Sequence, residues 1–194
     1  MSDLLIRAAA AEDADAIAAL HVASWRDSFR GMIPDAVLDG PMLDERLPMW
    51  RQTLSAMPAG RFVLVATEPN EDGTTRIDGF ASGGRRRGRD RANLPFEAEI
   101  YTLYIAAARR GQNLGCRLMA SMGVRLQLFG HASVMLWTLQ ANTAGRAFYE
   151  GLGGRPVGQR EEWFAGTPLR EVGYGWSRIE NLLGACGDRL TIAS

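Results

Sequence analysis

Residues 103–119 carry the side chains from which proteins build phosphate-binding loops. An apolar run ends at Ile105, a short turn rich in Arg and Gly follows, and an amphipathic segment begins near Asn113. A helix that starts there leaves its first backbone N–H groups without carbonyl partners, and the positive end of its dipole adds to their effect. Such a helix start favours a bound phosphate or pyrophosphate. The segment therefore predicts a site for a phosphorylated cofactor.

Two common phosphate-binding motifs do not fit this segment. A P-loop needs Lys and then Ser or Thr after its second glycine, and neither follows Gly115. A dinucleotide fingerprint needs G-x-G-x-x-G, whereas the order here is Arg110-x-x-Asn113-x-Gly115. That spacing resembles the R/Q-x-x-G-x-G/A signature of the GNAT superfamily of N-acetyltransferases, which binds the pyrophosphate of acyl-coenzyme A. Asn113 stands where the family usually has Gly, and Asn tolerates left-handed backbone angles better than most residues.

Two further segments resemble the same family. Residues 142–153 read Asn-Thr-Ala-Gly-Arg-Ala-Phe-Tyr-Glu-Gly-Leu-Gly, which is similar to the family's N-x-x-A-x-x-F-Y-x-x-L-G segment. Residues 25–34, from Trp25 to Pro34, are similar to a W-x-x-[YF]-x-G-x-[IL]-P segment in one branch of these enzymes. The resemblance extends from about Leu5 to Trp176, which is nearly the whole chain.

The resemblance implies a fold and a function. The fold is α/β (α+β): residues 1–178 form a single GNAT-like domain, and residues 179–194 form a C-terminal tail. Its mixed, mostly antiparallel, twisted sheet has about seven strands flanked by helices, and it is splayed between the fourth and fifth strands. The implied function is transfer of an acetyl group from acetyl-CoA to a primary amine by direct attack in a ternary complex. The acceptor is a small-molecule or peptide amine, and a homodimer is compatible with the family.

The resemblance also assigns binding residues. The backbone of Tyr104 and Ile105 is expected to pair with the pantetheine arm as an added strand would. Asn142 is expected to bind the same arm, and it is also placed to cap the following helix. Trp25 and Phe29 border the acceptor site in this family, although both are equally suited to core packing. The pyrophosphate is expected at the loop and the start of the helix: Arg110, Gly111, Gln112, Asn113, Leu114, Gly115 and Cys116.

Tyr149 and Glu99 are the catalytic residues that the resemblance implies. Tyr149 matches the family's proton donor to the departing thiolate, and its alternative role is that of a core aromatic beside Phe148. Glu99 lies on the expected central strand, where Glu97 should point to the same side because alternate strand residues share a face. A carboxylate there is suited to take the proton of the attacking amine, directly or through water. Either glutamate is equally suited to pair with a neighbouring Arg or to face solvent.

Composition and charge exclude several other classes of protein. The 22 basic residues balance the 22 acidic ones, so no overall positive charge attracts nucleic acid or an anionic membrane. Two Cys and two His are too few and too scattered for a disulfide framework or a metal site. No apolar run has the length of a membrane span or the pattern of a signal peptide. We therefore expect a soluble cytoplasmic protein that binds no metal, nucleic acid or membrane.

Hydrophobic periodicity and turn residues predict alternating strands and helices. Strands are expected over residues 4–7, 61–67, 76–82, 97–105, 133–140, 155–164 and 169–177. Helices are expected over residues 12–29, 43–56, 113–129 and 143–152. Pro48 should kink or divide the second helix. Residues 71–73 are expected to form a turn, and the arginine-rich run 85–91 a solvated loop.

Two other functions are compatible with the same motifs. A protein of this fold could bind acyl-CoA as a sensor or scaffold without turnover, and it would then need neither Tyr149 nor Glu99. It could also be an interaction protein without a cofactor. Asn113 favours that class, as does Gly154, which replaces the aromatic residue usual after the Leu-Gly pair. Cys116 has no His nearby in the sequence and is expected to pack rather than to act as a nucleophile.

Overall fold

The computed structural model describes residues 4–70, 74–88 and 94–192. The strands are β1 (Leu5–Ala8), β2 (Arg61–Pro69), β3 (Thr75–Arg85), β4 (Ala98–Ile105), β5 (Val134–Leu139), β6 (Arg155–Phe164) and β7 (Thr167–Trp176). The helices are α1 (Ala14–Phe29), α2 (Asp35–Leu38), α3 (Met42–Ser55), α4 (Leu114–Leu128), α5 (Thr143–Gly151) and α6 (Ile179–Ile192), with 3-10 turns η1 (Ala11–Asp13) and η2 (Ala107–Arg109). The elements expected from the sequence are present, with bounds that agree to within three residues.

One sheet contains all seven strands, in the order β1-β2-β3-β4-β5-β7-β6. Every neighbouring pair is antiparallel except β4 and β5, which are parallel. The expected mixed, mostly antiparallel sheet is therefore confirmed. The crossover between the parallel strands contains α4, as a parallel connection requires a long segment that is usually a helix.

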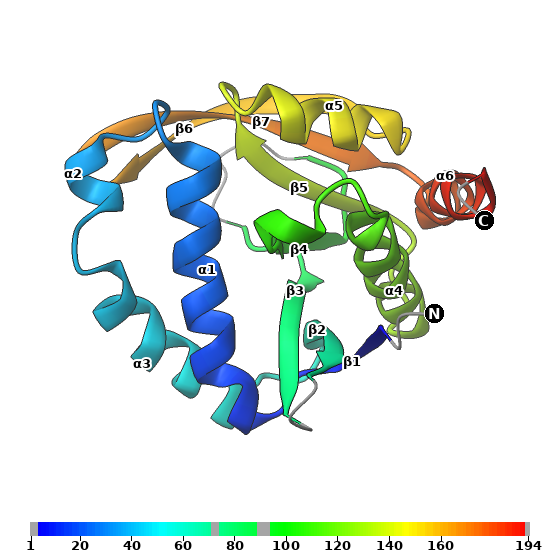
Figure 1. Ribbon diagram of the computed structural model, residues 1–194. Coiled ribbons are helices and arrows are strands. Elements are labelled where there is room, and N and C mark those ends of the chain that lie inside the picture. The colour runs from blue at the N-terminus through cyan, green and yellow to red at the C-terminus, as the bar shows by residue number, and fades with distance from the viewer. Residues whose placement is uncertain (1–3, 71–73, 89–93, 193–194) are drawn as a thin grey trace.

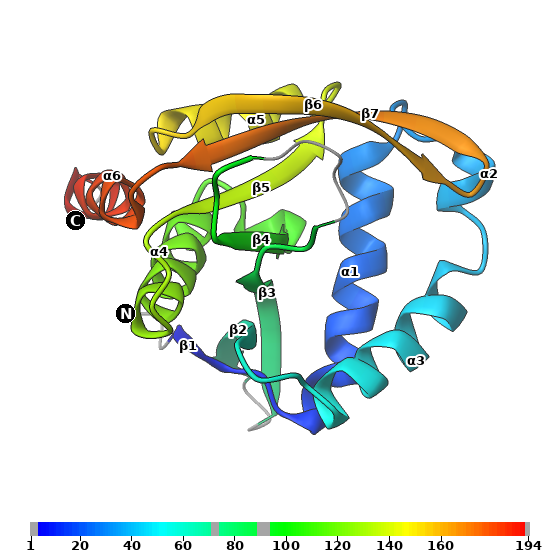
Figure 2. The same cartoon turned by 180° about the vertical axis from the view of Figure 1, so that it is seen from behind.

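Helices cover both faces of the sheet. In Figures 1 and 2, α1 and α3 lie on one side of β3 and α4 lies on the other, while α5 runs along β5 and β7. Ile17 and Trp50, from α1 and α3, are buried against Phe80 of β3. On the opposite face, Leu118 and Met122 of α4 are buried in a second cluster. Burial of these apolar side chains fixes the helices relative to β3 and β4.

The strands β4 and β5 diverge along their length. They pair only from Ala98 to Ile100 with Val134 to Leu136, so the rest of β4 pairs with β3 alone. The register between β3 and β4 shifts between Ser82 and Gly83, and such a bulge bends a strand. The splay expected between the fourth and fifth strands is confirmed, and it opens a gap beside residues 101–105.

The C-terminal segment contains a helix. Within residues 179–194, the expected tail, residues 179–192 form α6. Ile179, Leu182 and Cys186 are fully buried against the rest of the core, and α6 lies beside α4 in both views of the ribbon (Figures 1 and 2). Packing against α4 stabilises a helix that its own pattern indicates only weakly.

Two other expectations concern local features. Pro48 lies inside α3, which continues through it as one helix rather than two. The turn expected at residues 71–73 and the part of the arginine-rich run from residue 89 onward lie outside the described residues.

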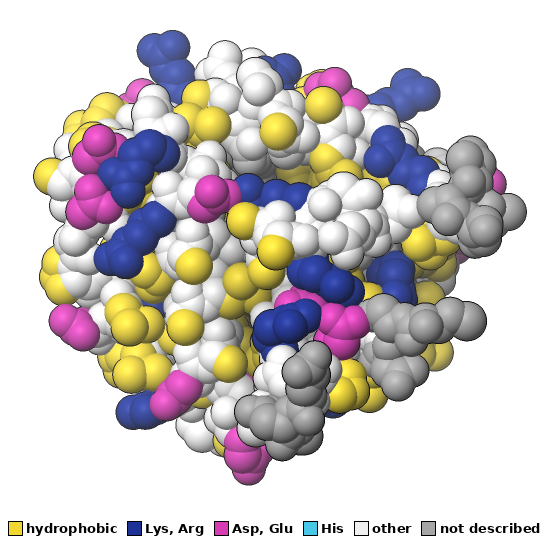
Figure 3. All heavy atoms as spheres, in the orientation of Figure 1, with side chains coloured by type: hydrophobic (Ala, Val, Ile, Leu, Met, Phe, Trp, Pro, Cys, Tyr) yellow, Lys and Arg dark blue, Asp and Glu magenta, His cyan; other side chains and the backbone are white. Residues whose placement is uncertain are grey.

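The described part of the chain contains no helix with the length and apolar character needed to cross a bilayer. In the same residues, no three His, Cys, Asp or Glu side chains are grouped to hold a metal ion. Figure 3 shows basic and acidic side chains interspersed over one face of the molecule rather than separated by sign.

Candidate active site

A cleft of about 990 Å³ is lined by nearly all the site residues expected from the sequence. It lies where β4 and β5 diverge, and α1, the start of α4, α5 and the β6–β7 hairpin complete its walls. Of the expected site residues, only Gln112 does not line it, because its side-chain amide donates to the carbonyl of Ala108 at 2.9 Å. The lining includes Trp25, Phe29, Glu99, Tyr104, Ile105, Arg110, Gly111, Asn113, Leu114, Gly115, Cys116, Asn142 and Tyr149.

The loop between β4 and α4 has the backbone shape of an anion-binding helix start. Gly111 has φ of 74° and Asn113 has φ of 59°, so both are in the left-handed region, which Asn tolerates. The amide of Arg117 donates to the carbonyl of Asn113 at 3.1 Å. Helix geometry leaves the preceding amides, from Leu114 to Cys116, without carbonyl partners. These N–H groups lie at the cleft and are suited to bind a phosphate.

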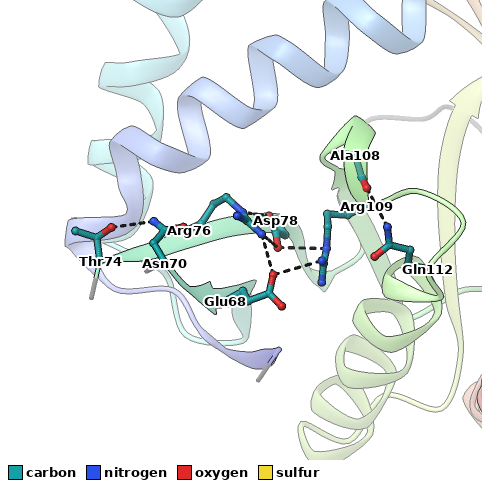
Figure 4. A network of polar contacts seen from close by, with 8 residues as sticks. All are labelled: Glu68, Asn70, Thr74, Arg76, Asp78, Ala108, Arg109 and Gln112. Carbon is teal, nitrogen blue, oxygen red and sulfur yellow. Dashed lines mark hydrogen bonds and ion pairs between the residues drawn. The ribbon is translucent and has the colours of Figure 1, made fainter. Parts of the chain in front are cut away.

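Four charged residues anchor the beginning of this loop (Figure 4). Arg76 donates to Asp78 at 2.6 Å and to Glu68 at 2.8 Å, and Arg109 forms ion pairs with both carboxylates at 3.3 Å. The Asp78 side chain is only 3% exposed, and its backbone carbonyl accepts a hydrogen bond from Ala106. Two carboxylates from β2 and β3 therefore hold η2 in place just before the loop. Spacing along the chain does not indicate this network, because its partners are distant in the sequence.

Arg110 reaches across the cleft to α1. Its guanidinium forms an ion pair with Asp27 and donates to the hydroxyl of Ser28. Arg110 and Asp27 are exposed, and Ser28 is half-buried. This contact ties the loop to the helix on the opposite wall, a link that the sequence expectation for Arg110 did not include.

Tyr149 lies near the end of α5 with its ring at the cleft. The ring is 5.3 Å from that of Phe148 and 6.0 Å from that of Tyr174. Burial raises the pKa of Tyr149, and the nearby phenol of Tyr104 raises it further. The phenol therefore keeps its proton at neutral pH. Within the described residues its hydroxyl has no hydrogen-bond partner, so the proton is available to a bound molecule.

Asn142 begins the helix that carries this tyrosine. Its side-chain oxygen accepts a hydrogen bond from the amide of Gly145 at 2.9 Å, which is an N-cap contact. Asn142 therefore caps α5, which is one of the two roles expected for it. Its side-chain nitrogen lies 3.4 Å from the hydroxyl of Thr138 on β5, and the residue still lines the cleft.

Gly154 stands where the family usually has an aromatic residue after the Leu-Gly pair. The structure explains this difference. A Cβ on Gly154 would lie 2.7 Å from the ring of Trp176 and 2.9 Å from the carbonyl of Tyr149. The indole N–H of Trp176 donates to the carbonyl of Leu152 at 2.7 Å. The ring of Trp176 occupies the space beside the backbone here, so an aromatic side chain at position 154 has no room.

The cleft wall formed by α1 and β4 is aromatic. The indole N–H of Trp25 donates to the Tyr104 hydroxyl at 2.7 Å, and its ring is 4.8 Å from Phe164 and 5.3 Å from Phe29. Burial raises the pKa of Tyr104 to about 12. The residues expected near the acceptor, Trp25 and Phe29, therefore both line the cleft and pack in an aromatic cluster.

His21 packs against this wall. Its ring stacks on that of Tyr104 with centroids 4.9 Å apart, and its Nδ1 accepts a hydrogen bond from the Trp50 indole at 3.1 Å. Burial lowers the pKa of His21 to about 3, so the ring is neutral at physiological pH. An accepting Nδ1 places the proton on Nε2.

The two glutamates of the central strand do not share a face. Glu99 is 2% exposed and lines the cleft. Its carboxylate accepts from the Arg87 guanidinium at 2.5 Å and from the Arg87 amide at 3.0 Å. Glu97 is exposed, precedes the start of β4, and accepts from the amide of Ala132 at 2.6 Å. The expectation that both point the same way is wrong because regular strand geometry begins only after Glu97.

A sequence profile of the Acetyltransferase (GNAT) family matches residues 22–153. The matched segment includes the second half of α1, the loop before α4 and the Asn142–Tyr149 segment. The chain belongs to the GNAT acetyltransferase family. It is therefore an acetyltransferase, and its cofactor is acetyl-CoA.

This chain is similar to other acetyltransferases over most of its length. It is 29% identical over 177 residues to the uncharacterized N-acetyltransferase YuaI of Bacillus subtilis, covering 91% of this chain and 95% of that protein. Its fold matches that of the PaiA N-acetyltransferase of Thermoplasma acidophilum, solved with coenzyme A (17% identity, TM-score 0.62, 90% of this chain and 99% of that one). It also matches YncA of Salmonella typhimurium, solved with acetyl-CoA (21% identity, TM-score 0.60, 92% and 95%).

The residues that line the cleft are suited to bind acetyl-CoA. A Cβ on Gly111 would meet nothing within 4 Å, so the loop surface there is open, and the helix start that follows supplies orphan N–H groups. Beside it, the backbone of β4 from Tyr101 to Ile105 has no strand partner on the β5 side. The N–H groups at the start of α4 are thus suited to the phosphates of the cofactor. The free backbone of β4, in the same cleft, is suited to the amides of its pantetheine arm.

Proposed function

We propose that this protein transfers an acetyl group from acetyl-CoA to a primary amine by direct attack in a ternary complex. The observation that carries the proposal is the shared cleft: the orphan amides of α4, the unpaired edge of β4 and the Tyr149 phenol all face it. A sensor that only binds acyl-CoA has no need of the phenol. The acceptor is a small-molecule or peptide amine.

Two parts of the chain hold the cofactor in this proposal. The amides between Leu114 and Cys116 bind the pyrophosphate, and the backbone of Tyr104 and Ile105 pairs with the pantetheine arm. When bound, acetyl-CoA supplies an activated acyl thioester. An N–H near Ile105 is placed to polarise the acyl carbonyl, as backbone donors do in oxyanion holes.

Tyr149 acts as the proton donor to the departing sulfur. A phenol is a weaker acid than a thiol, and burial weakens this one further. The donation therefore depends on close placement rather than on acidity. The short helix α5, capped by Asn142, gives the phenol a rigid position at the cleft.

Glu99 handles the proton of the attacking amine, through water. Its carboxylate is fixed by Arg87 at the point where β4 leaves β5, and the proton reaches it from the acceptor side of the cleft. Trp25 and Phe29 form the apolar wall against which the acceptor lies. Holding the amine beside the thioester contributes in its own right, by as much as about 7–11 kcal/mol in well-oriented reactions.

An acceptor screen tests the proposal. The protein is incubated with acetyl-CoA and panels of amino acids, polyamines, aminoglycosides and peptides, and release of free thiol is followed. The proposal expects thiol release that requires both the protein and one class of amine, with the acetylated amine detected by mass spectrometry. Tight binding of acetyl-CoA without turnover on any panel would instead favour the sensor.

A further inference from the structure

Among the described residues, five arginines line the cleft, and four of them pair with carboxylates of this chain. The pairs are Arg87–Glu99, Arg109–Asp78, Arg110–Asp27 and Arg160–Glu171. The fifth is Arg189, near the end of α6, which forms no ion pair with any acidic side chain in the part of the chain that the structure describes. A cation without a partner in such a cleft is available to an anionic ligand.

Arg189 lies against the last residue of α5. A Cβ on Gly151 would overlap the Nη2 atom of Arg189, so the guanidinium rests directly on the glycine backbone. The absence of a side chain at position 151 gives the arginine room to approach α5.

A line of contacts connects Arg189 with the cofactor loop. Phe148 is three residues before Gly151, so the two share a face of α5. The Phe148 ring in turn packs against Gly115, at the start of α4. Phe148 and Gly151, on one face of α5, thus connect the Arg189 guanidinium with the start of α4, where the orphan amides lie.

We propose that Arg189 binds the 3′-phosphate of acetyl-CoA. The inference rests on the proposed function, because it takes the pyrophosphate to lie on the amides at the start of α4. The cofactor carries one other phosphate group, on its ribose, and Arg189 is the described cleft arginine that no carboxylate occupies. A planar guanidinium binds a phosphate with two parallel hydrogen bonds. Since α6 lies outside the family match at residues 22–153, this contact belongs to the chain's own C-terminal helix.

Binding measurements with two ligands test the proposal. Isothermal titration calorimetry compares coenzyme A with 3′-dephospho-coenzyme A on the full-length wild type and on Arg189→Gln. We expect the wild type to bind coenzyme A at least about 10-fold more tightly than the dephospho form, the effect of a charge-assisted hydrogen bond. Arg189→Gln should lose this preference and bind the dephospho form as the wild type does. Arg189→Lys should retain part of it.

Arg178→Gln is the matched control. Arg178 precedes α6, pairs with Glu180 and does not line the cleft, so the variant removes the same charge and should keep both wild-type affinities. Equal affinity of the wild type for both ligands would overturn the assignment. An equal loss for both ligands in Arg189→Gln would do the same, since it would place the guanidinium on the pyrophosphate. A wild type that binds neither ligand would refute the proposed function itself.

Discussion

The ring of Phe148 on α5 lies so close to Gly115 on α4 that a Cβ at position 115 would be 3.0 Å from its Cζ atom. The contact joins the two segments whose sequences carry the family resemblance. The absence of a side chain at position 115 gives the Phe148 ring room to pack against the start of α4.

Replacing Gly115 with Val should abolish stabilisation by the cofactor. The added side chain would displace Phe148 and crowd the orphan amides. For the wild type at a coenzyme A concentration 100 times Kd, binding should add about 2.7 kcal/mol to the free energy of unfolding, which raises Tm. Gly184→Ala on α6 is the control, because its Cβ would meet nothing within 4 Å. An undiminished rise in Tm for Gly115→Val would place the pyrophosphate elsewhere.

Replacing Tyr149 with Phe should lower kcat by roughly 10²-fold or more, the range typical of a lost general acid. The variant keeps the ring and removes only the hydroxyl, so the affinity for acetyl-CoA should stay nearly unchanged. Tyr174→Phe is the matched control, since its ring lies 6.0 Å from that of Tyr149 but does not line the cleft. A Tyr149→Phe enzyme with the wild-type kcat would leave this residue with a packing role alone.

Replacing Glu99 with Gln should slow the reaction most at low pH. The acceptor amine is then mainly protonated and needs a base, whereas at higher pH solution supplies neutral amine and the defect should shrink. Glu97→Gln should behave as the wild type because that side chain is exposed and outside the cleft. The pH–rate profiles of the three proteins give the comparison. Identical profiles for the wild type and Glu99→Gln would assign the proton to water or the backbone.

His21 should remain neutral across the physiological range. Burial lowers its pKa from 6.5 to about 3, so the unfolded chain binds a proton more readily than the folded one. Its contribution to stability is complete above about pH 6.5 and is lost as pH falls toward 3. NMR titration can follow it directly, because the chain has only one other histidine, His131. A His21 resonance that titrates near pH 6.5 would contradict the packing of its ring against Tyr104.

Short stretches of sequence were enough to predict the order of the strands and helices and the position of the cofactor-binding loop. Strand and helix periods are local, and an anion-binding helix start needs only a strand, a turn and a helix in succession. The left-handed angle at Asn113 followed from the same short segment. Three motifs in order were enough to indicate the GNAT fold and the splay between the fourth and fifth strands.

Only the tertiary structure decided how the charged side chains pair and what the C-terminal segment does. Arg110 binds Asp27, which is 83 residues earlier in the chain, and Arg109 binds Glu68 and Asp78 on other strands. Long side chains have many rotamers, and which partner they reach depends on packing between elements rather than on spacing along the chain. The same holds for α6. Residues 179–192 have a weak hydrophobic periodicity, and they form a helix because they pack against α4. This packing brings Arg189 to the cleft.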